Sequence, residues 1–293
     1  MPSTRQIKSR IKSVKSNKQI TKAMELIAAS KLRKAQDAAL KTRDYADMAR
    51  DILSSLSTVS DIAKHPMFQK REVKSRLVIL VTSDRGLAGA YNSNVHRIFT
   101  KQLKADSESG VMTKVITIGK KSARFTAKLQ NCESVGAYPS SDKLKQSDIR
   151  PIVQTVSDAF ADQSIDTVEL IGTKFVNSFT QTAYMQTLLP AGIETLNDPS
   201  DESDPRQHRD MKFEPNTEEV LNYVLIKLIE AQLFQTLLDS NASEQAMRRV
   251  AMKNASDNAS DIVDDLTLEM NKVRQAAITQ ELSEISAGAE SLK

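Results

Sequence analysis

Two stretches of the chain, residues 3–65 and 216–287, contain neither proline nor glycine. Because these two residues interrupt helices most strongly, a stretch this long without them predicts a continuous helix. At 1.5 Å per residue each helix would be roughly 90 Å long or more, whereas a compact globule of this chain length is only about 50 Å across. We therefore expect both helices to protrude from any globular part and to need partners.

Small and apolar residues follow both stretches at alternating spacings of three and four, which is the pattern of a coiled-coil seam. An antiparallel pairing of the two helices follows from this pattern. The alternative, in which each helix packs on a globular domain as an ordinary surface helix, stays open. The first seam comprises Ala28, Leu32, Ala35, Ala39, Thr42, Ala46, Ala49, Leu53 and Leu56, and the second comprises Met252, Ala255, Ala259, Ile262, Leu266, Met270, Val273 and Ala277.

The region between the two stretches has short apolar runs that alternate with helical patterns. Continuous apolar runs indicate buried parallel strands, and their alternation with helices predicts a small open α/β sheet. The fold expected is thus α/β, with a small Rossmann-like central domain at residues 66–215 between helices at 1–65 and 216–293. The expected strands are 76–82, 114–119 and 166–172, and the expected helices are 92–104, 120–130 and 149–161.

Charge is distributed unevenly along the chain. Residues 5–43 hold twelve lysines and arginines against only Glu25 and Asp37, so the first helix is a cation. Residues 194–219 hold nine acids against three bases and include prolines, which predicts an exposed acidic loop before the second helix. A basic helix that binds nucleic acid or anionic lipid is the remoter interpretation, because no aromatic residues are interleaved with the charges.

The single cysteine, Cys132, excludes an intrachain disulfide, so nothing indicates an oxidising compartment. The first residues, MPSTRQIKSRIK, lack the apolar core of a signal peptide, and no apolar run approaches the ~18 residues of a membrane span. We expect an intracellular chain.

Sequence signals for catalysis or cofactor binding are weak. The loop SDRGLAGAYN at 83–92 has two glycines but lacks the third glycine of a dinucleotide fingerprint, and GKKS at 119–122 lacks the rest of a phosphate loop. His65, His96 and His208 are scattered, and acidic pairs such as Glu281 with Glu284 are typical of a solvated helix. The expectation is no catalytic residue, no cofactor and no metal.

Three motifs resemble the gamma subunit of F-type ATP synthases, the central rotor shaft of a rotary enzyme. NKQITKAMELIAASKLRKAQ at 17–36 is similar to that family's first coiled-coil helix, and VTSDRGLAGAYN at 81–92 is similar to a motif of its central domain. The third motif is the most specific. It covers residues 243–291, including Ile278-Thr279-x-Glu281 followed by Gly288-Ala289.

The resemblance implies a function. In that family the antiparallel coiled coil stands inside a hexamer of alternating α and β subunits, and its rotation drives the catalytic sites of β through successive states. The lower part of the shaft binds the epsilon subunit and the membrane c-ring, which couples proton flow to ATP synthesis or hydrolysis. The chain would thus be a non-catalytic subunit that contacts the membrane only through the complex, at the cytoplasmic face of a bacterial cell membrane.

The resemblance also implies interface residues. Met24 matches a family position close to the β contact, while Arg248, Gln275, Thr279 and Glu281 match polar positions implicated in the contact between rotor and β. On the first helix, the basic residues Lys22, Lys31, Arg33 and Lys34 either meet an acidic segment of β or form a solvated face.

One alternative function from a different class stays open: a free-standing coiled-coil scaffold or tether. A scaffold would self-associate or bind one elongated partner, whereas a rotor shaft enters a hexamer as a single copy. An α/β hydrolytic enzyme using the central domain would instead show activity in the isolated chain.

Overall fold

The computed structural model describes residues 4–59, 65–141, 144–191 and 217–290. Along the sequence, a central α/β region lies between two long helices, α1 (Thr4–Val59) and α5 (Thr217–Glu290). This arrangement confirms the expected fold class. Most of the acidic segment 194–219 lies outside the described residues.

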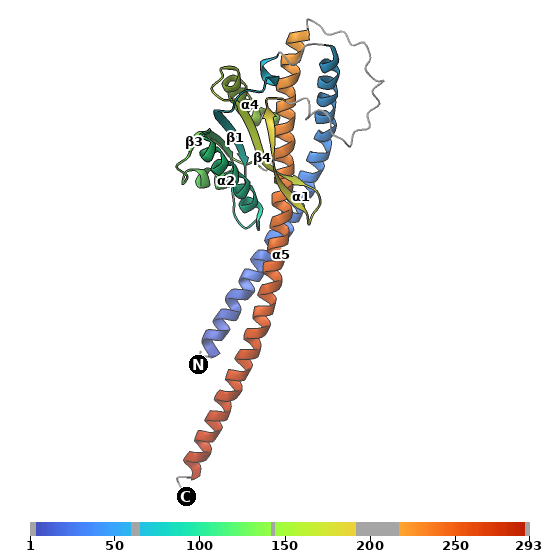
Figure 1. Ribbon diagram of the computed structural model, residues 1–293. Helices are drawn as coiled ribbons and strands as arrows, with labels where there is room; N and C mark the ends of the chain where they lie inside the picture. The colour runs from blue at the N-terminus through green and yellow to red at the C-terminus, as the bar shows by residue number, and fades with distance from the viewer. Residues whose placement is uncertain (1–3, 60–64, 142–143, 192–216, 291–293) are drawn as a thin grey trace. The chain divides into compact units, whose positions relative to one another are not determined.

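The chain divides into two compact units, and the boundaries fall inside both long helices. One unit holds residues 1–29 and 248–293, and the other holds residues 30–247. In each unit the segments of α1 and α5 run in opposite directions (Figure 1). The expected division into 1–65, 66–215 and 216–293 stays a prediction.

The unit of residues 30–247 is built on a five-stranded sheet with the order β3-β2-β1-β4-β5. Its strands are β1 (Ser75–Val81), β2 (Met112–Ile118), β3 (Cys132–Tyr138), β4 (Thr167–Phe175) and β5 (Gln181–Leu189). The first four strands pair in parallel, and β5 pairs antiparallel with β4. The three expected strands are confirmed as β1, β2 and β4, while β3 and β5 were not predicted.

Three helices and one 3-10 turn connect these strands. They are α2 (Tyr91–Ser109), α3 (Lys120–Thr126), α4 (Gln146–Ala161) and the 3-10 turn η2 (Pro66–Phe68). All three predicted helices are therefore present, although α3 is shorter than expected.

At the centre of the sheet β1 is buried on both faces, and this explains its continuous apolar run. Val78 and Leu80 point to the face covered by α2, where they pack with Val95 and Phe99. Leu77, Ile79 and Val81 point to the other face, which α4 and the first part of α5 cover. A strand covered on both faces has no solvent side to be polar, so its sequence does not alternate.

The first part of α5 belongs to the core of the sheet. Its apolar residues there repeat at spacings of three and four and join the cluster that contains β1 and α4: Leu225, Leu228, Ile229, Leu233 and Leu237. Farther along, α5 comes so close to β4 that a Cβ on Gly172 would lie 2.4 Å from Thr236 Cγ2. The backbone N–H of Thr173 donates to Ser240 Oγ at 3.1 Å, which attaches α5 to β4 by a hydrogen bond.

The predicted seam of α1 is confirmed where its side chains are described. In the unit of residues 30–247, Leu32 and Ala35 form a buried cluster with Ala242 and Ala246 of α5, and Ala39 is also buried. In the other unit Ala28 is buried. Side chains of Ala46, Ala49, Leu53 and Leu56 lie outside the described residues.

The predicted seam of α5 is confirmed at Met252 and Ala259, which are buried, and is wrong at Ile262 and Ala277, which are exposed. A single partner helix covers only a narrow stripe of another helix, so residues of α5 outside that stripe stay exposed. Ala255, Leu266, Met270 and Val273 are half-buried. From residue 274 to 287 every side chain is exposed, so none of the residues that the structure describes covers this part of α5.

Replacing Ala35 with aspartate should destabilise the packing of the two helices. The carboxylate would enter the cluster of Leu32, Ala242 and Ala246, where a buried polar group without partners costs about 1–3 kcal/mol. We expect a lower thermal unfolding midpoint for Ala35→Asp. The control is Ser30→Asp, which adds the same charge at an exposed position of the same helix. Equal midpoints for the two variants would refute the seam at Ala35.

Candidate interaction surfaces

The five predicted interface residues all lie in the unit formed by residues 1–29 and 248–293. Met24 on α1 and Arg248 on α5 are half-buried. Gln275, Thr279 and Glu281 are exposed near the end of α5. The structure therefore places three of the five on a surface that is free to meet another protein.

The end of α5 carries an apolar stripe that the sequence analysis did not identify. Ile278, Leu282 and Ile285 are 49%, 60% and 69% exposed. At about 100° per residue, these three side chains together with Gln275 and Thr279 fall within an arc of roughly 120°. We call these five residues the tip stripe. Its residues recur at spacings of three and four, but they lie on a different row of the helix from the predicted seam.

The three predicted polar residues near the end of α5 lie on two different sides of the helix. Gln275 and Thr279 are adjacent, one helical turn apart. The Thr279 hydroxyl donates a hydrogen bond to the backbone carbonyl oxygen of Gln275 at 3.0 Å. Glu281 lies about 160° around the helix from Thr279 and borders the stripe beside Ile285. The structure thus brings Gln275 and Thr279 together and leaves Glu281 on another face.

α1 offers a second exposed apolar surface close to Met24. Ile20, Leu26 and Ile27 are each more than half exposed. Beside them, Lys22 donates to the Glu25 carboxylate at 2.9 Å. Exposed large apolar side chains that gather on one segment mark a surface that another protein covers.

The basic residues in the other unit, Arg33 and Lys34, are exposed, and Lys31 is half-buried. Lys31 and Lys34 line a cavity of about 320 Å³ together with Ala35, Ala38, Leu144, Leu238 and Asn241. The face of α1 around this cavity is consequently positive.

The loop that follows β1 is held by its own side chains. One carboxylate oxygen of Asp84 accepts from the backbone N–H groups of Lys120 at 2.9 Å and Ser140 at 3.1 Å. Ser83 and Asn92 also bond to each other across the loop. The backbone N–H groups of Lys120 and Ser140 at this carboxyl end of the sheet are therefore satisfied by the chain itself.

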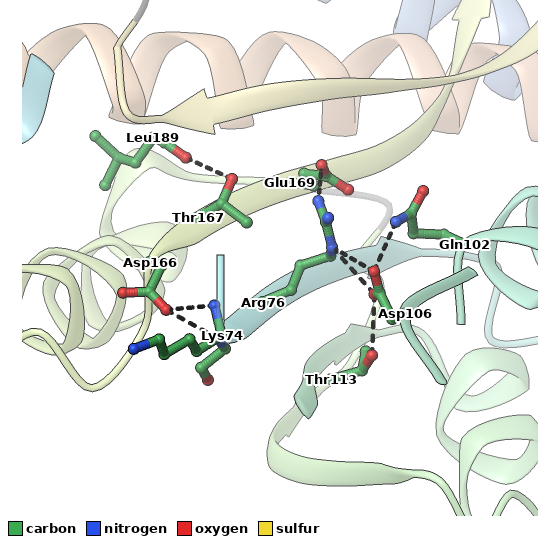
Figure 2. A network of polar contacts seen from close by, with 10 residues as sticks. Lys74, Arg76, Gln102, Asp106, Thr113, Asp166, Thr167, Glu169 and Leu189 are labelled. Atoms are coloured by element: carbon green, nitrogen blue, oxygen red, sulfur yellow. Dashed lines mark hydrogen bonds and ion pairs between the residues drawn. The ribbon is translucent and has the colours of Figure 1, made fainter. Parts of the chain in front are cut away.

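At the opposite end of the sheet a buried ionic network joins β1, β2, β4 and α2 (Figure 2). Arg76 on β1 lies between two carboxylates, and its Nε is 3.0 Å from each carboxylate oxygen of Asp106. Its guanidinium also pairs with Oε1 of Glu169 on β4. Gln102 and Thr113 donate to Asp106 at 2.9 and 3.0 Å. The side chains of Arg76, Asp106 and Glu169 are only 14%, 3% and 8% exposed.

Burial raises the pKa of Glu169 above its ordinary value. The Arg76 charge and its hydrogen bond oppose this rise, and the nearby negative charge of Asp106 adds to it. Asp106 accepts hydrogen bonds on both oxygens, whereas Oε2 of Glu169 is buried and has no hydrogen-bond partner among the described residues. The two carboxylates of the network therefore have different environments.

Among the residues that the structure describes, no group of three or more histidine, cysteine, aspartate or glutamate side chains is arranged to hold a metal ion. Within the same residues, no helix is both long and apolar enough to span a membrane.

The sequence of the chain matches a known protein family. A family model described as ATP synthase matches residues 3–292. The ATP synthase gamma chain of Opitutus terrae is 41% identical over 98% of each chain, and that of Nitrosococcus oceani is 40% identical over the full length of both.

Solved structures agree with this match. A chain in the central stalk and c-ring structure of the Tetrahymena thermophila mitochondrial ATP synthase superimposes with a TM-score of 0.63 at 27% identity, covering 81% of this chain and 99% of that one. A chain of the Euglena gracilis mitochondrial ATP synthase gives a TM-score of 0.65 at 16% identity, covering 99% of this chain and 94% of that one. At that identity the second likeness concerns the fold alone.

Proposed function

The chain belongs to the ATP synthase gamma chain family, and from this membership we propose that it is the central rotor shaft of a rotary ATP synthase. It transmits torque between a membrane c-ring and the catalytic sites of an α/β hexamer. In this way proton flow is coupled to ATP synthesis or hydrolysis. The chain itself supplies no catalytic residue in this proposal, because the chemistry takes place in β.

The observation that carries the proposal is the exposed end of α5. A helix whose last turns present Ile278, Leu282 and Ile285 to solvent needs an external partner. A closed ring of subunits would surround the helix end and cover these apolar side chains on all sides. An asymmetric shaft inside such a ring presents a different face to each subunit, so that three equivalent sites adopt different states.

We assign the proposed partners to the two units. The unit with the tip stripe enters the hexamer, with Gln275 and Thr279 contacting β on one face and Glu281 on another. Met24 and Arg248 contact the hexamer farther from the tip. The sheet-containing unit binds the epsilon subunit and the c-ring. The complex is peripheral to the membrane, at the cytoplasmic face of a bacterial cell.

The variant Gln275→Ala with Thr279→Ala tests the tip stripe. Each interface hydrogen bond is worth about 0.5–1.5 kcal/mol, so losing one or two should reduce torque transfer several-fold. ATP-driven proton pumping in inverted membrane vesicles, divided by the ATPase rate, measures this loss. The control variant, Gln280→Ala with Glu284→Ala, removes two polar side chains that bond to each other on the opposite face of the same turns, and it should have a smaller effect. Unchanged coupling in the first variant would exclude these residues from the contact.

A further inference from the structure

The ionic network at the amino end of the sheet has an unbalanced charge. Arg76 is its only cation, and Asp106 and Glu169 are both carboxylates. All three side chains are largely buried, so water neutralises little of the excess negative charge. With both carboxylates ionised the network would hold one uncompensated charge.

Hydrogen bonding distinguishes the two carboxylates. Asp106 accepts hydrogen bonds from Arg76, Gln102 and Thr113, and both of its carboxylate oxygens act as acceptors. Glu169 accepts a hydrogen bond only from Arg76, through Oε1, and its buried Oε2 has no hydrogen-bond partner among the described residues. An ionised carboxylate whose second oxygen lacks a donor is costly to bury. The cost of the uncompensated charge therefore falls on Glu169.

Among the described residues, the neighbouring elements supply no second cation to this network. β1 contributes Arg76, α2 contributes Gln102 and Asp106, and β2 contributes Thr113. On β5 the residue paired with Glu169 in the sheet register is Thr187, which is uncharged. The charged groups facing Glu169 are thus Arg76 and Asp106.

We propose that Glu169 is a proton-binding site of the folded chain. Its carboxyl group holds a proton and continues to accept from Arg76 through Oε1, while Arg76 and Asp106 form the ion pair of the network. When the pH rises, the carboxyl releases the proton and the contact between β1, β4 and α2 weakens. This site is separate from the tip stripe and adds a pH-sensitive element to the unit that contains the sheet.

The sign of the pH dependence follows from linkage. The folded chain binds this proton more tightly than the unfolded chain does, because burial raises the pKa of Glu169. The stability that this proton contributes is therefore lost as the pH rises from the ordinary glutamate pKa of about 4.3 through the raised pKa. Above the raised pKa, Glu169 adds no further pH dependence to the unfolding free energy. This is the opposite of the behaviour of a glutamate stabilised as an anion.

Carbon-13 NMR of the carboxyl groups in the full-length chain tests the proposal directly. The Glu169 resonance is the one absent from the spectrum of Glu169→Gln. We expect its titration midpoint to lie above about 4.3. A midpoint at or below that value would overturn the proposal, because Glu169 would then be an ordinary or stabilised anion.

Urea unfolding at a series of pH values gives a second readout. In the unmodified chain the unfolding midpoint should contain a component that falls with rising pH, and Glu169→Gln should lack it. Glu133→Gln, the same change at an exposed position of β3, should keep it. Identical pH profiles for Glu169→Gln and the unmodified chain would overturn the proposal. If Glu169→Gln folds poorly, through-bond assignment of the Glu169 carboxyl resonance in the unmodified chain lets the NMR titration decide without that variant.

Discussion

Replacing Arg76 with leucine should destabilise the chain by roughly 3–5 kcal/mol, the range for breaking a buried ion pair by removing one partner. The loss leaves the Asp106 carboxylate buried without its counter-ion and removes the hydrogen-bond donor of Glu169. Chemical denaturation of the full-length variant at neutral pH measures the change in unfolding free energy. The destabilisation should shrink at acidic pH, where protonation of the carboxyl groups removes the charges that Arg76 neutralised.

Two further variants show whether the destabilisation of Arg76→Leu comes from the buried carboxylates or from the loss of any arginine. Arg97→Leu removes an exposed arginine from α2 and should leave stability nearly unchanged. Adding Asp106→Asn and Glu169→Gln to Arg76→Leu removes the unpaired charges and should recover part of the stability. If Arg76→Leu were as stable as Arg97→Leu, the network would not be an essential part of the fold.

Gly119→Ala should be comparably severe, at roughly 2–5 kcal/mol, because it combines backbone strain with a collision that no side-chain rotation relieves. Gly119 joins β2 to α3 with φ of 102°, a conformation that favours glycine. A Cβ at this position would lie 2.2 Å from the Thr82 carbonyl oxygen. The strand and the helix would have to move apart, so we expect a large decrease in the urea unfolding midpoint.

Gly110→Ala provides the matched control. Gly110 also has a positive φ, of 71°, but a Cβ there would have no atom within 4 Å. This variant should therefore show only the strain of the backbone, about 1 kcal/mol. The difference between the two variants measures the collision with Thr82. Equal effects would mean that the backbone at 119 relaxes freely.

The helices and the central strands could be predicted because their signals are local. The lack of proline and glycine predicted α1 and α5, and the apolar runs predicted β1, β2 and β4 because these strands are buried on both faces. β3 lies at one edge of the sheet, where most of its residues are exposed, so its sequence has no continuous apolar run. β5 is the other edge strand and mixes polar with apolar residues.

The interactions that depend on distant parts of the chain could not be predicted. Arg76, Asp106 and Glu169 are far apart in the sequence, and only the parallel pairing of the strands and the packing of α2 bring them together. The coiled-coil pattern continues to Ala277, although no helix in the described part of the chain covers residues 274–287 of α5. Periodicity identifies a face of a helix, but it does not tell where the partner helix ends.

The candidate site was found in part. Family resemblance supplied Gln275 and Thr279, which the structure places on one exposed face, and it supplied Glu281, which lies on another. Ile278 is part of the family motif but was not predicted as a contact residue, and neither was Leu282, because the interface positions implied by the resemblance on α5 are all polar. Their role as a contact surface follows from exposure, which only the structure gives.

Assembly with purified α and β subunits from the same source tests the central claim most directly. The mass of the complex by light scattering gives the number of copies of this chain per hexamer, and the ATPase rate reports whether the chain organises the catalytic sites. The account predicts one copy per hexamer and a large gain in ATPase activity. A failure to bind the hexamer, or a multimer of this chain alone, would contradict a rotor shaft and favour a coiled-coil scaffold.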